Sequence, residues 1–165
     1  MMSRAAFALA LLSLTGCGLR PVYGGGSSGV VAATLSAVAI GPIEGQAGWL
    51  VRNKLIDRLG GGDGSAAYRL DVTLDDNITS FGLRSDRAAT QERRTLRARY
   101  QLVDVRTGMV VLDSTAGSDM GIDIVSSEYA TVAAEQTALE DLADIVADQI
   151  TARLALYASR TAKAK

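Results

Sequence analysis

Few side chains in this sequence could carry out covalent chemistry. The chain contains no histidine and a single cysteine, Cys17. Histidine is the commonest general base and metal ligand, so a catalytic site would have to use carboxylates alone. The adjacent acids Asp75 and Asp76 would point to opposite faces of a strand and would not easily share a substrate atom. The sequence therefore predicts a protein that is not an enzyme and needs no metal or cofactor.

Cys17 stands where a different chemistry is expected. Arg4 gives a positive start, residues 5–14 are apolar and small residues precede the cysteine, which is the pattern of a secretory signal peptide. The segment Leu14-Thr15-Gly16-Cys17 resembles the lipobox of bacterial lipoprotein precursors, in which the thiol receives a diacylglycerol. We therefore expect residues 1–16 to be a signal peptide that is removed, and Cys17 to carry a covalent lipid. The alternative is an ordinary buried cysteine.

The residues after Cys17 bear on location and reach. Gly18 occupies the position at which an aspartate would favour retention in the inner membrane, so we expect anchorage at the periplasmic face of the outer membrane. Gly24 to Gly29 form a glycine and serine tract that behaves as a flexible tether. Residues 17–34 are thus predicted to be a lipidated N-terminus and tether.

Hydrophobic periodicity in the rest of the chain predicts one folded domain over 35–158, followed by a C-terminal tail over 159–165. The strands we expect alternate between apolar and polar residues, so that one face is buried and the other is wet. The predicted elements are a strand over 35–40, a helix over 46–59 ended by Gly60, a strand over 68–75, a hairpin over 96–112 whose second strand continues into 113–124, and a helix over 127–158. The expected fold class is α+β, a two-layer sandwich with two helices packed on one face of a mostly antiparallel four-stranded sheet.

The charges are unevenly distributed, although the net charge is only −1. Between Arg84 and Arg106, seven arginines accompany three acids, which leaves a local excess of four positive charges. The guanidinium fork suits bidentate binding of phosphate or carboxylate. We expect the arginines that we place in a loop to contact an anionic lipid or a protein partner: Arg84, Arg87, Arg93 and Arg94. Nucleic acid is disfavoured as a partner because the signal peptide directs the chain outward.

Two further arginines have two equally weighted interpretations. Arg97 and Arg99 could belong to the same binding surface. They could also be the wet face of a strand, paired with acids on neighbouring strands such as Asp71 and Asp113.

With these features in place, the chain resembles the LptE family of lipopolysaccharide-assembly lipoproteins of the outer membrane, in the form that begins Cys-Gly-Leu-Arg-Pro-Val-Tyr. The resemblance spans nearly the whole mature chain and is carried by short sequence words. These are Cys17 to Tyr23, Arg52 with Asn53 and Leu55 in the first helix, Arg94-Thr95-Leu96 leading into a strand that ends at Asp104, and Tyr129 to Gln136 at the start of the last helix.

The resemblance implies a function without catalysis. Members of the family are expected to sit inside a large outer-membrane β-barrel, LptD, as a plug and assembly aid, and to contact lipopolysaccharide through basic loop residues. A different class of function stays open, in which the chain is an auxiliary lipoprotein or lipid carrier of an inner-membrane transporter. Such a carrier would need an apolar cavity between its layers.

Overall fold

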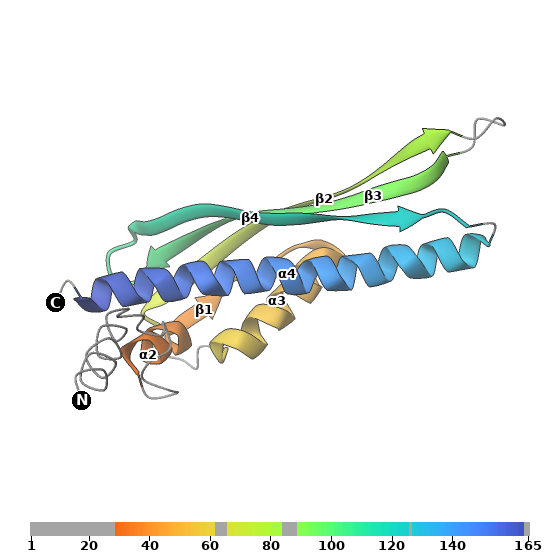
Figure 1. The fold of residues 1–165 in the computed structure, drawn as a ribbon. Helices are drawn as coiled ribbons and strands as arrows, with labels where there is room; N and C mark the ends of the chain where they lie inside the picture. Colours follow the sequence, from red (N-terminus) through yellow and green to blue (C-terminus); the bar gives the residue numbers. More distant parts are fainter. Residues whose placement is uncertain (1–28, 62–65, 84–88, 126, 164–165) are drawn as a thin grey trace, which may run out of the picture.

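The computed structural model describes residues 29–61, 66–83, 89–125 and 127–163. The elements in chain order are α2 (Val30–Ser36), β1 (Val38–Ile40), α3 (Gly45–Leu59), β2 (Tyr68–Leu83), β3 (Ala89–Asp104), β4 (Val110–Asp123) and α4 (Glu128–Lys163). The strands form a sheet in the order β1-β2-β3-β4, with β1 parallel to β2 and the other pairs antiparallel. In this part of the chain, the helices lie against one face of the sheet (Figure 1), which confirms the α+β two-layer prediction.

The molecule is long and has two distinct ends. The proximal end holds α2, the turn between β3 and β4, and the last turns of α4, whereas the distal end holds the end of β2, the beginning of β3 and the start of α4 (Figure 1). The strands β2 and β3 pair from Tyr68 opposite Asp104 to Leu83 opposite Ala89. At about 3.4 Å per residue, a 16-residue strand such as β2 spans roughly 50 Å, close to the length of the 36-residue helix α4.

The core lies between the helices and the half of the sheet nearer the proximal end. Alternate residues of β2 and β3 face the helices, and the apolar stripe of α4 covers them. Fully buried members of this core include Leu70, Leu96, Tyr100 and Leu102 from the sheet, Val51 and Leu55 from α3, and Leu139, Leu142, Val146 and Ile150 from α4. Burying large aliphatic side chains of this kind contributes about 1.5–3 kcal/mol each.

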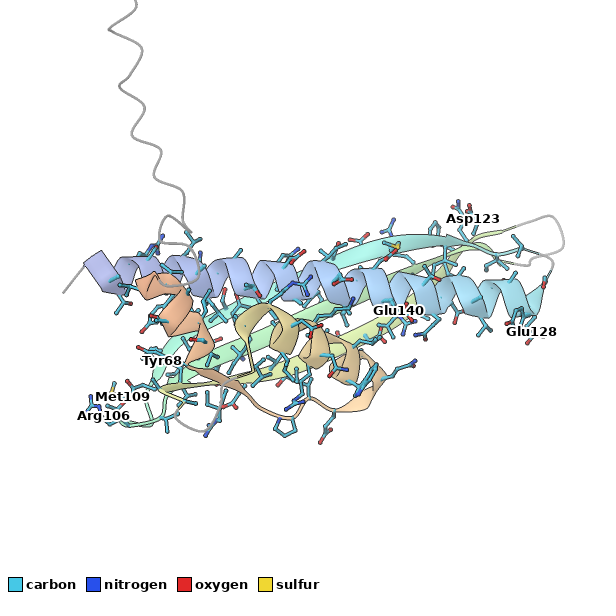
Figure 2. All side chains as sticks on the ribbon, turned by 90° about the horizontal axis from the view of Figure 1, so that it is seen from below. Tyr68, Arg106, Met109, Asp123, Glu128 and Glu140 are labelled. Atoms are coloured by element: carbon cyan, nitrogen blue, oxygen red, sulfur yellow. The ribbon has the colours of Figure 1, made fainter. Side chains whose placement is uncertain are left out.

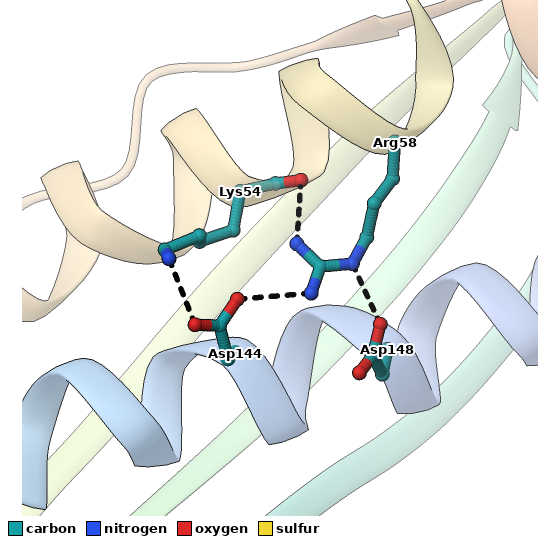
Figure 3. Close-up of polar contacts among 4 residues, drawn as sticks. All are labelled: Lys54, Arg58, Asp144 and Asp148. Carbon is teal, nitrogen blue, oxygen red and sulfur yellow. Dashed lines mark hydrogen bonds and ion pairs between the residues drawn. The ribbon is translucent and has the colours of Figure 1, made fainter.

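The helices α3 and α4 run side by side in the same direction. Lys54 Nζ lies 2.8 Å from Asp144 Oδ2, and Arg58 Nε lies 2.6 Å from Asp148 Oδ1, so the two pairs share one sequence offset (Figure 3). Arg58 also donates to Asp144 Oδ1 at 2.9 Å, and these partners hold the pKa of the Asp144 carboxyl below its ordinary value. A row of charged side chains therefore fixes the register between the two helices.

The same row includes the side-chain amide of Gln136. Gln136 Oε1 accepts from Gln46 Nε2 at 2.9 Å, and Gln136 Nε2 donates to Glu140 Oε1 at 3.0 Å. The amide is satisfied, but its partners are side chains and it is only half-buried.

Two glycines of α3 act in different ways. Gly60 ends the helix in the left-handed region at φ 84°, and its N–H donates to the carbonyl of Ile56 at 2.9 Å, as the sequence predicts. Gly48 instead permits a close approach, because a Cβ there would lie 2.5 Å from the carbonyl oxygen of Ile43. The segment that leads into α3 can thus fold back against the helix.

The strand β4 forms one edge of the sheet. A side chain of α4 contacts the backbone near the middle of β4. Gln149 Oε1 accepts from the backbone N–H of Gly117 at 2.9 Å, and Gln149 Nε2 donates to the carbonyl of the same residue at 3.3 Å. The side-chain amide therefore occupies the place that a neighbouring strand would take at this position.

The structure corrects several boundaries that we expected from the sequence. Residues 35 and 36 end the helix α2 instead of starting a strand, and β1 begins at Val38. This helix packs on α4 and buries Leu35, so ordered structure reaches into the segment that we expected to be tether. The helix α4 continues to Lys163, through much of the expected tail.

Candidate functional site at the distal hairpin

The four candidate arginines do not share one loop. Arg93 and Arg94 lie within β3, paired with Thr79 and Ile78 of β2, which corrects their placement in a loop. Both faces of this part of β3 carry polar residues, so the sequence shows no apolar alternation that would indicate a strand. Arg84 and Arg87 lie outside the described residues, as does Cys17.

Arg94 is a brace between the two layers. Its Nε and Nη2 donate to the carboxylate oxygens of Asp76 at 2.9 and 2.6 Å, and its Nη1 donates to the backbone carbonyl of Glu135 in α4 at 2.9 Å. The Arg94 side chain is only 12% exposed. The hydrogen bond to Asp76 raises the pKa of the guanidinium, so Arg94 is a fixed cation. Its geometry serves the packing of α4 on the sheet, with three hydrogen bonds already made.

A pair of carboxyl groups lies beside this brace. Glu92 of β3 and Glu135 of α4 face one another between the layers, and Ser80 Oγ donates to Glu92 Oε1 at 3.0 Å. Burial, followed by the charge of Glu92, raises the pKa of the Glu135 carboxyl, while Arg94 acts in the opposite direction. The other oxygen of Glu92 is buried without a hydrogen-bond partner. Two like charges therefore meet where α4 crosses the hairpin.

Arg93 points away from the helices and is available for contacts. Its guanidinium lies over the ring of Phe81, 5.4 Å from the centroid, and its Nε lies 3.7 Å from Asp119 Oδ2. The side chain remains 58% exposed. An exposed guanidinium stacked on an aromatic ring can still bind phosphate or carboxylate groups through its free donors.

The arginines nearer the middle of the strand behave differently. Arg99 donates to Asp113 at 2.9 Å, as the strand-face interpretation predicts, whereas Asp71 is held by Arg69 on its own strand. Arg97 and Arg99 line a hollow of about 610 Å³ on the outer face of the sheet, together with Thr73, Asp75, Thr115 and Gly117. Gly117 is required there, because a Cβ would lie 2.5 Å from the Arg97 side chain.

Apolar side chains accompany the distal charges, and the sequence analysis did not predict that they are exposed. Ile78 and Phe81 on β2 are about 40% exposed, and Tyr129 and Val132 are exposed at the start of α4. For Ile78 and Phe81, the only signal in the sequence was an apolar residue within a polar stretch. An arginine stacked on an exposed aromatic ring is typical of contact surfaces rather than of catalytic sites.

Metal-binding and membrane-spanning features are not found in the described ranges. Within residues 29–61, 66–83, 89–125 and 127–163, no cluster of three or more potential metal ligands occurs. Among the same residues, no helix has the length and apolar character needed to cross a membrane.

The sequence of residues 35–154 matches the model of the LptE family, described as lipopolysaccharide-assembly. The match covers most of the chain and contains most of the core, the distal hairpin and α4 as far as Leu154. The chain belongs to the LptE family. All four of the expected contact residues, Arg84, Arg87, Arg93 and Arg94, therefore lie in the part of the sequence that defines this membership, whereas Cys17 precedes it.

Three solved structures that are similar to this chain carry the word lipoprotein in their names. A lipoprotein from Caulobacter crescentus is 29% identical, with a TM-score of 0.65, 81% of this chain and 98% of that chain covered. The rare lipoprotein B from Shewanella oneidensis is 10% identical, with a TM-score of 0.58 and coverages of 73% and 94%. Lipoprotein B from Nitrosomonas europaea is 12% identical, with a TM-score of 0.58 and coverages of 74% and 83%. A search of curated proteins gave no match.

Proposed function

We propose that this LptE-family chain is a lipoprotein of the outer membrane that plugs an LptD-type β-barrel, assists its assembly and takes part in lipopolysaccharide transport to the cell surface. Cys17 would carry the lipid, and the folded body would sit in the barrel with the distal hairpin leading. The observation that carries the proposal is the family match over residues 35–154. The lipoprotein names of similar structures support the anchor.

The shape of the molecule suits this role. A body built on strands and a helix of roughly 50 Å can fill an elongated lumen, since the hydrocarbon core of a bilayer is about 30 Å thick. The outer face of the sheet carries the paired charges and hydroxyls that a polar barrel wall would meet, among them Arg99 with Asp113. The family membership thus agrees with a polar, rigid insert.

The distal end supplies the contacts that we propose for lipid or barrel. Arg93 offers an exposed guanidinium stacked on Phe81, and Arg84 and Arg87 follow in the adjoining segment of the sequence. Anionic groups such as lipid phosphates are bound by arginines of this kind. Arg94 supports the surface from behind, since its donors are directed at Asp76 and Glu135.

The alternative, a lipid carrier or auxiliary lipoprotein of an inner-membrane transporter, requires an apolar cavity between the layers. The space between α4 and the sheet is instead filled by side chains that are completely buried, including Leu139, Leu142 and Val146. A packed layer interface of this kind favours the plug over the carrier.

Two measurements test the proposal. Depletion of the protein should strip lipopolysaccharide from the cell surface and leave the barrel poorly folded; unchanged surface lipid and barrel folding would contradict the proposal. Affinity capture of the natural protein from solubilised membranes should yield a barrel of several hundred residues, whereas transporter subunits would support the carrier.

The anchor is tested separately by the mass of the natural mature protein. We expect a chain that begins at Cys17 and carries added acyl mass. A chain that retains residues 1–16, or one that is cut at Cys17 without acyl mass, would remove the basis for placing the protein at a membrane.

A further inference from the structure

The proximal end of the molecule exposes a cluster of apolar side chains on a well-held turn. Between β3 and β4, Val105 is 55% exposed, Met109 66% and Val110 48%. The turn is fixed by Asp104, whose Oδ1 accepts from the N–H of Thr107 at 2.8 Å and whose carbonyl accepts from Gly108 at 2.8 Å. Figure 2 shows Met109 and Arg106 at the extreme of this end. The apolar side chains are thus presented by a folded support.

The same end is basic, in contrast to the rest of α4. From Glu128 to Asp148 the chain has six acids and no basic residue, and from Gln149 to Lys165 it has four basic residues and no acid. Arg106 adds an exposed cation at the tip of the turn, and Arg160 is exposed near the end of α4. Asp104, the acid of this turn, is engaged with Thr107, which lowers the pKa of its carboxyl. Basic residues of the turn and of the last turns of α4 therefore share this end of the molecule with the apolar cluster.

The path of the chain brings this end to the membrane. Residue Gly29, where the described chain begins, leads into α2 at the proximal end (Figure 1). Eleven residues lie between it and Cys17, and a flexible glycine-rich chain of that length would have an r.m.s. reach of roughly 20 Å. An acylated Cys17 would hold the proximal end within that distance of the lipid surface.

We propose that the proximal end is a second membrane contact, in which Val105, Met109 and Val110 enter the headgroup region and Arg106 and Arg160 bind phosphates of anionic phospholipid. This inference rests on the proposed acylation of Cys17 and adds an orienting contact to it. Apolar groups rimmed by cations are the pattern of proteins that lie on anionic membrane surfaces. The contact sets the long axis of the body away from the membrane plane, so that the distal hairpin points away from the anchored leaflet.

The depth of Met109 in the bilayer can be measured directly. When Cys17 is acylated, the mature protein has no other cysteine, so a Met109→Cys variant offers one thiol for an environment-sensitive dye. In vesicles of phosphatidylethanolamine and phosphatidylglycerol, brominated lipid should quench this dye. A dye on Tyr129→Cys, an exposed site at the distal end, should not be quenched. Equal quenching of the two sites, or quenching of neither, would overturn the proposal.

The contribution of charge is measured without the acyl anchor. The mature chain with Cys17→Ser should bind vesicles containing phosphatidylglycerol in a salt-dependent manner, more tightly than vesicles of phosphatidylcholine alone. Arg106→Gln and Arg160→Gln should each weaken binding roughly fivefold. Met109→Ser should weaken it about tenfold, and Val132→Ser, at an exposed distal site, should leave it unchanged. Equal binding to both kinds of vesicle would contradict the proposal.

These outcomes are distinguishable from failure of the proposed function. If the chain is not a lipoprotein, the natural protein lacks acyl mass, whereas the vesicle affinity of the Cys17→Ser chain is unaffected. If the chain is a lipoprotein without this second contact, the acyl mass is present and the dye at position 109 stays in water.

Discussion

At the scale of single residues, the arginines of β3 show how position decides the role of one side-chain type. The side chain of Arg94 faces the helices and donates to Asp76 and to the Glu135 carbonyl. Arg93, one residue earlier, faces outward over Phe81. Adjacent strand residues point to opposite faces, so two arginines that look equivalent in the sequence have different partners. One supports the surface that the other presents.

The brace made by Arg94 should contribute to stability. Arg94→Met leaves the Asp76 carboxylate and the Glu135 carbonyl without their donor, and we expect a loss of about 1–3 kcal/mol in the free energy of unfolding, measured with urea. Arg94→Lys should recover only part of it, because an ammonium group cannot form the bidentate fork. Arg69→Met, which removes an exposed pair with Asp71, serves as control and should change little. Equal effects of the two methionine variants would contradict this account.

The pair Glu92 and Glu135 should make stability depend on pH in an unusual direction. Burial and the charge of Glu92 raise the pKa of Glu135, so the folded state takes up this proton more readily than the unfolded chain. The stabilising contribution is complete below the ordinary pKa of about 4.3 and is lost as pH rises through the folded value. We therefore expect Glu135→Gln to raise Tm at pH 7.5 and to have little effect near pH 3.5.

Other carboxylates act in the opposite sense and provide the background for that experiment. The pKa of Asp113 is lowered by Arg99 and that of Asp144 by Lys54 and Arg58, so their contribution is present above about pH 3.9 and is lost as pH falls further. The free energy of unfolding of every variant should therefore decrease in acid. Asp141→Asn, on the exposed side of α4, is the matched control. A pH-independent gain for Glu135→Gln would show that the gain comes from packing.

At the scale of elements, the sequence predicted the helices and strands that bury one face and expose the other. The helix over 46–59 and the strand from Tyr68 onward were expected almost as observed, because apolar residues recur with the period of each element. The distal parts of β2 and β3 were missed. There, Asn77 and Thr79 face outward while Asp76 and Arg94 face the helices, so polarity does not alternate.

The helix α2 was missed for a different reason. Its residues are small, apolar and partly β-branched, which suits a strand, and only packing on α4 selects the helix. The paired arginine Arg99 could be expected from its strand, but the choice between Asp113 and Asp71 depended on a register that the sequence does not contain. The site was thus predicted by residue type and charge, not by geometry.

The start of α3 should be sensitive to one methyl group. Gly48→Ala places a Cβ 2.5 Å from the Ile43 carbonyl, so the leading segment must move away from the helix. We expect a loss of about 1–3 kcal/mol, as for other overpacked sites, measured by urea unfolding. Gly121→Ala in β4 meets nothing within 4 Å and should be tolerated. If both variants are equally stable, the close approach at Gly48 does not constrain the fold.

At the scale of the whole molecule, the two ends have different chemistry. The distal end combines Arg93 and Phe81 with acids of β4 and α4, whereas the proximal end combines apolar side chains with a basic helix terminus. A rigid core joins the two ends. An elongated molecule whose ends differ in this way is suited to holding one orientation between a membrane and a protein partner.

The distal end can be tested with one charge reversal. Arg93→Glu should weaken binding to the barrel or to lipopolysaccharide by about tenfold or more, since a favourable charge-assisted contact becomes a repulsive one. Arg153→Glu is the control, because it reverses an exposed arginine of α4, which lies on the face of the sheet opposite to Arg93. Binding is measured by capture of the barrel and by titration with lipopolysaccharide. Equal binding by both variants would return Arg93 to the role of a solvated strand residue.

The contact between Gln149 and Gly117 has a consequence beyond the single molecule. An edge strand with unpaired backbone groups can pair with the edge strand of a second copy, and repeated pairing of this kind produces fibrils. The side-chain amide of Gln149 makes the hydrogen bonds that a peptide group of another strand would make. It therefore interrupts the unpaired edge of β4 near its centre and leaves only short unpaired stretches on either side. The resistance of the folded chain to self-assembly thus depends in part on the side chain of Gln149.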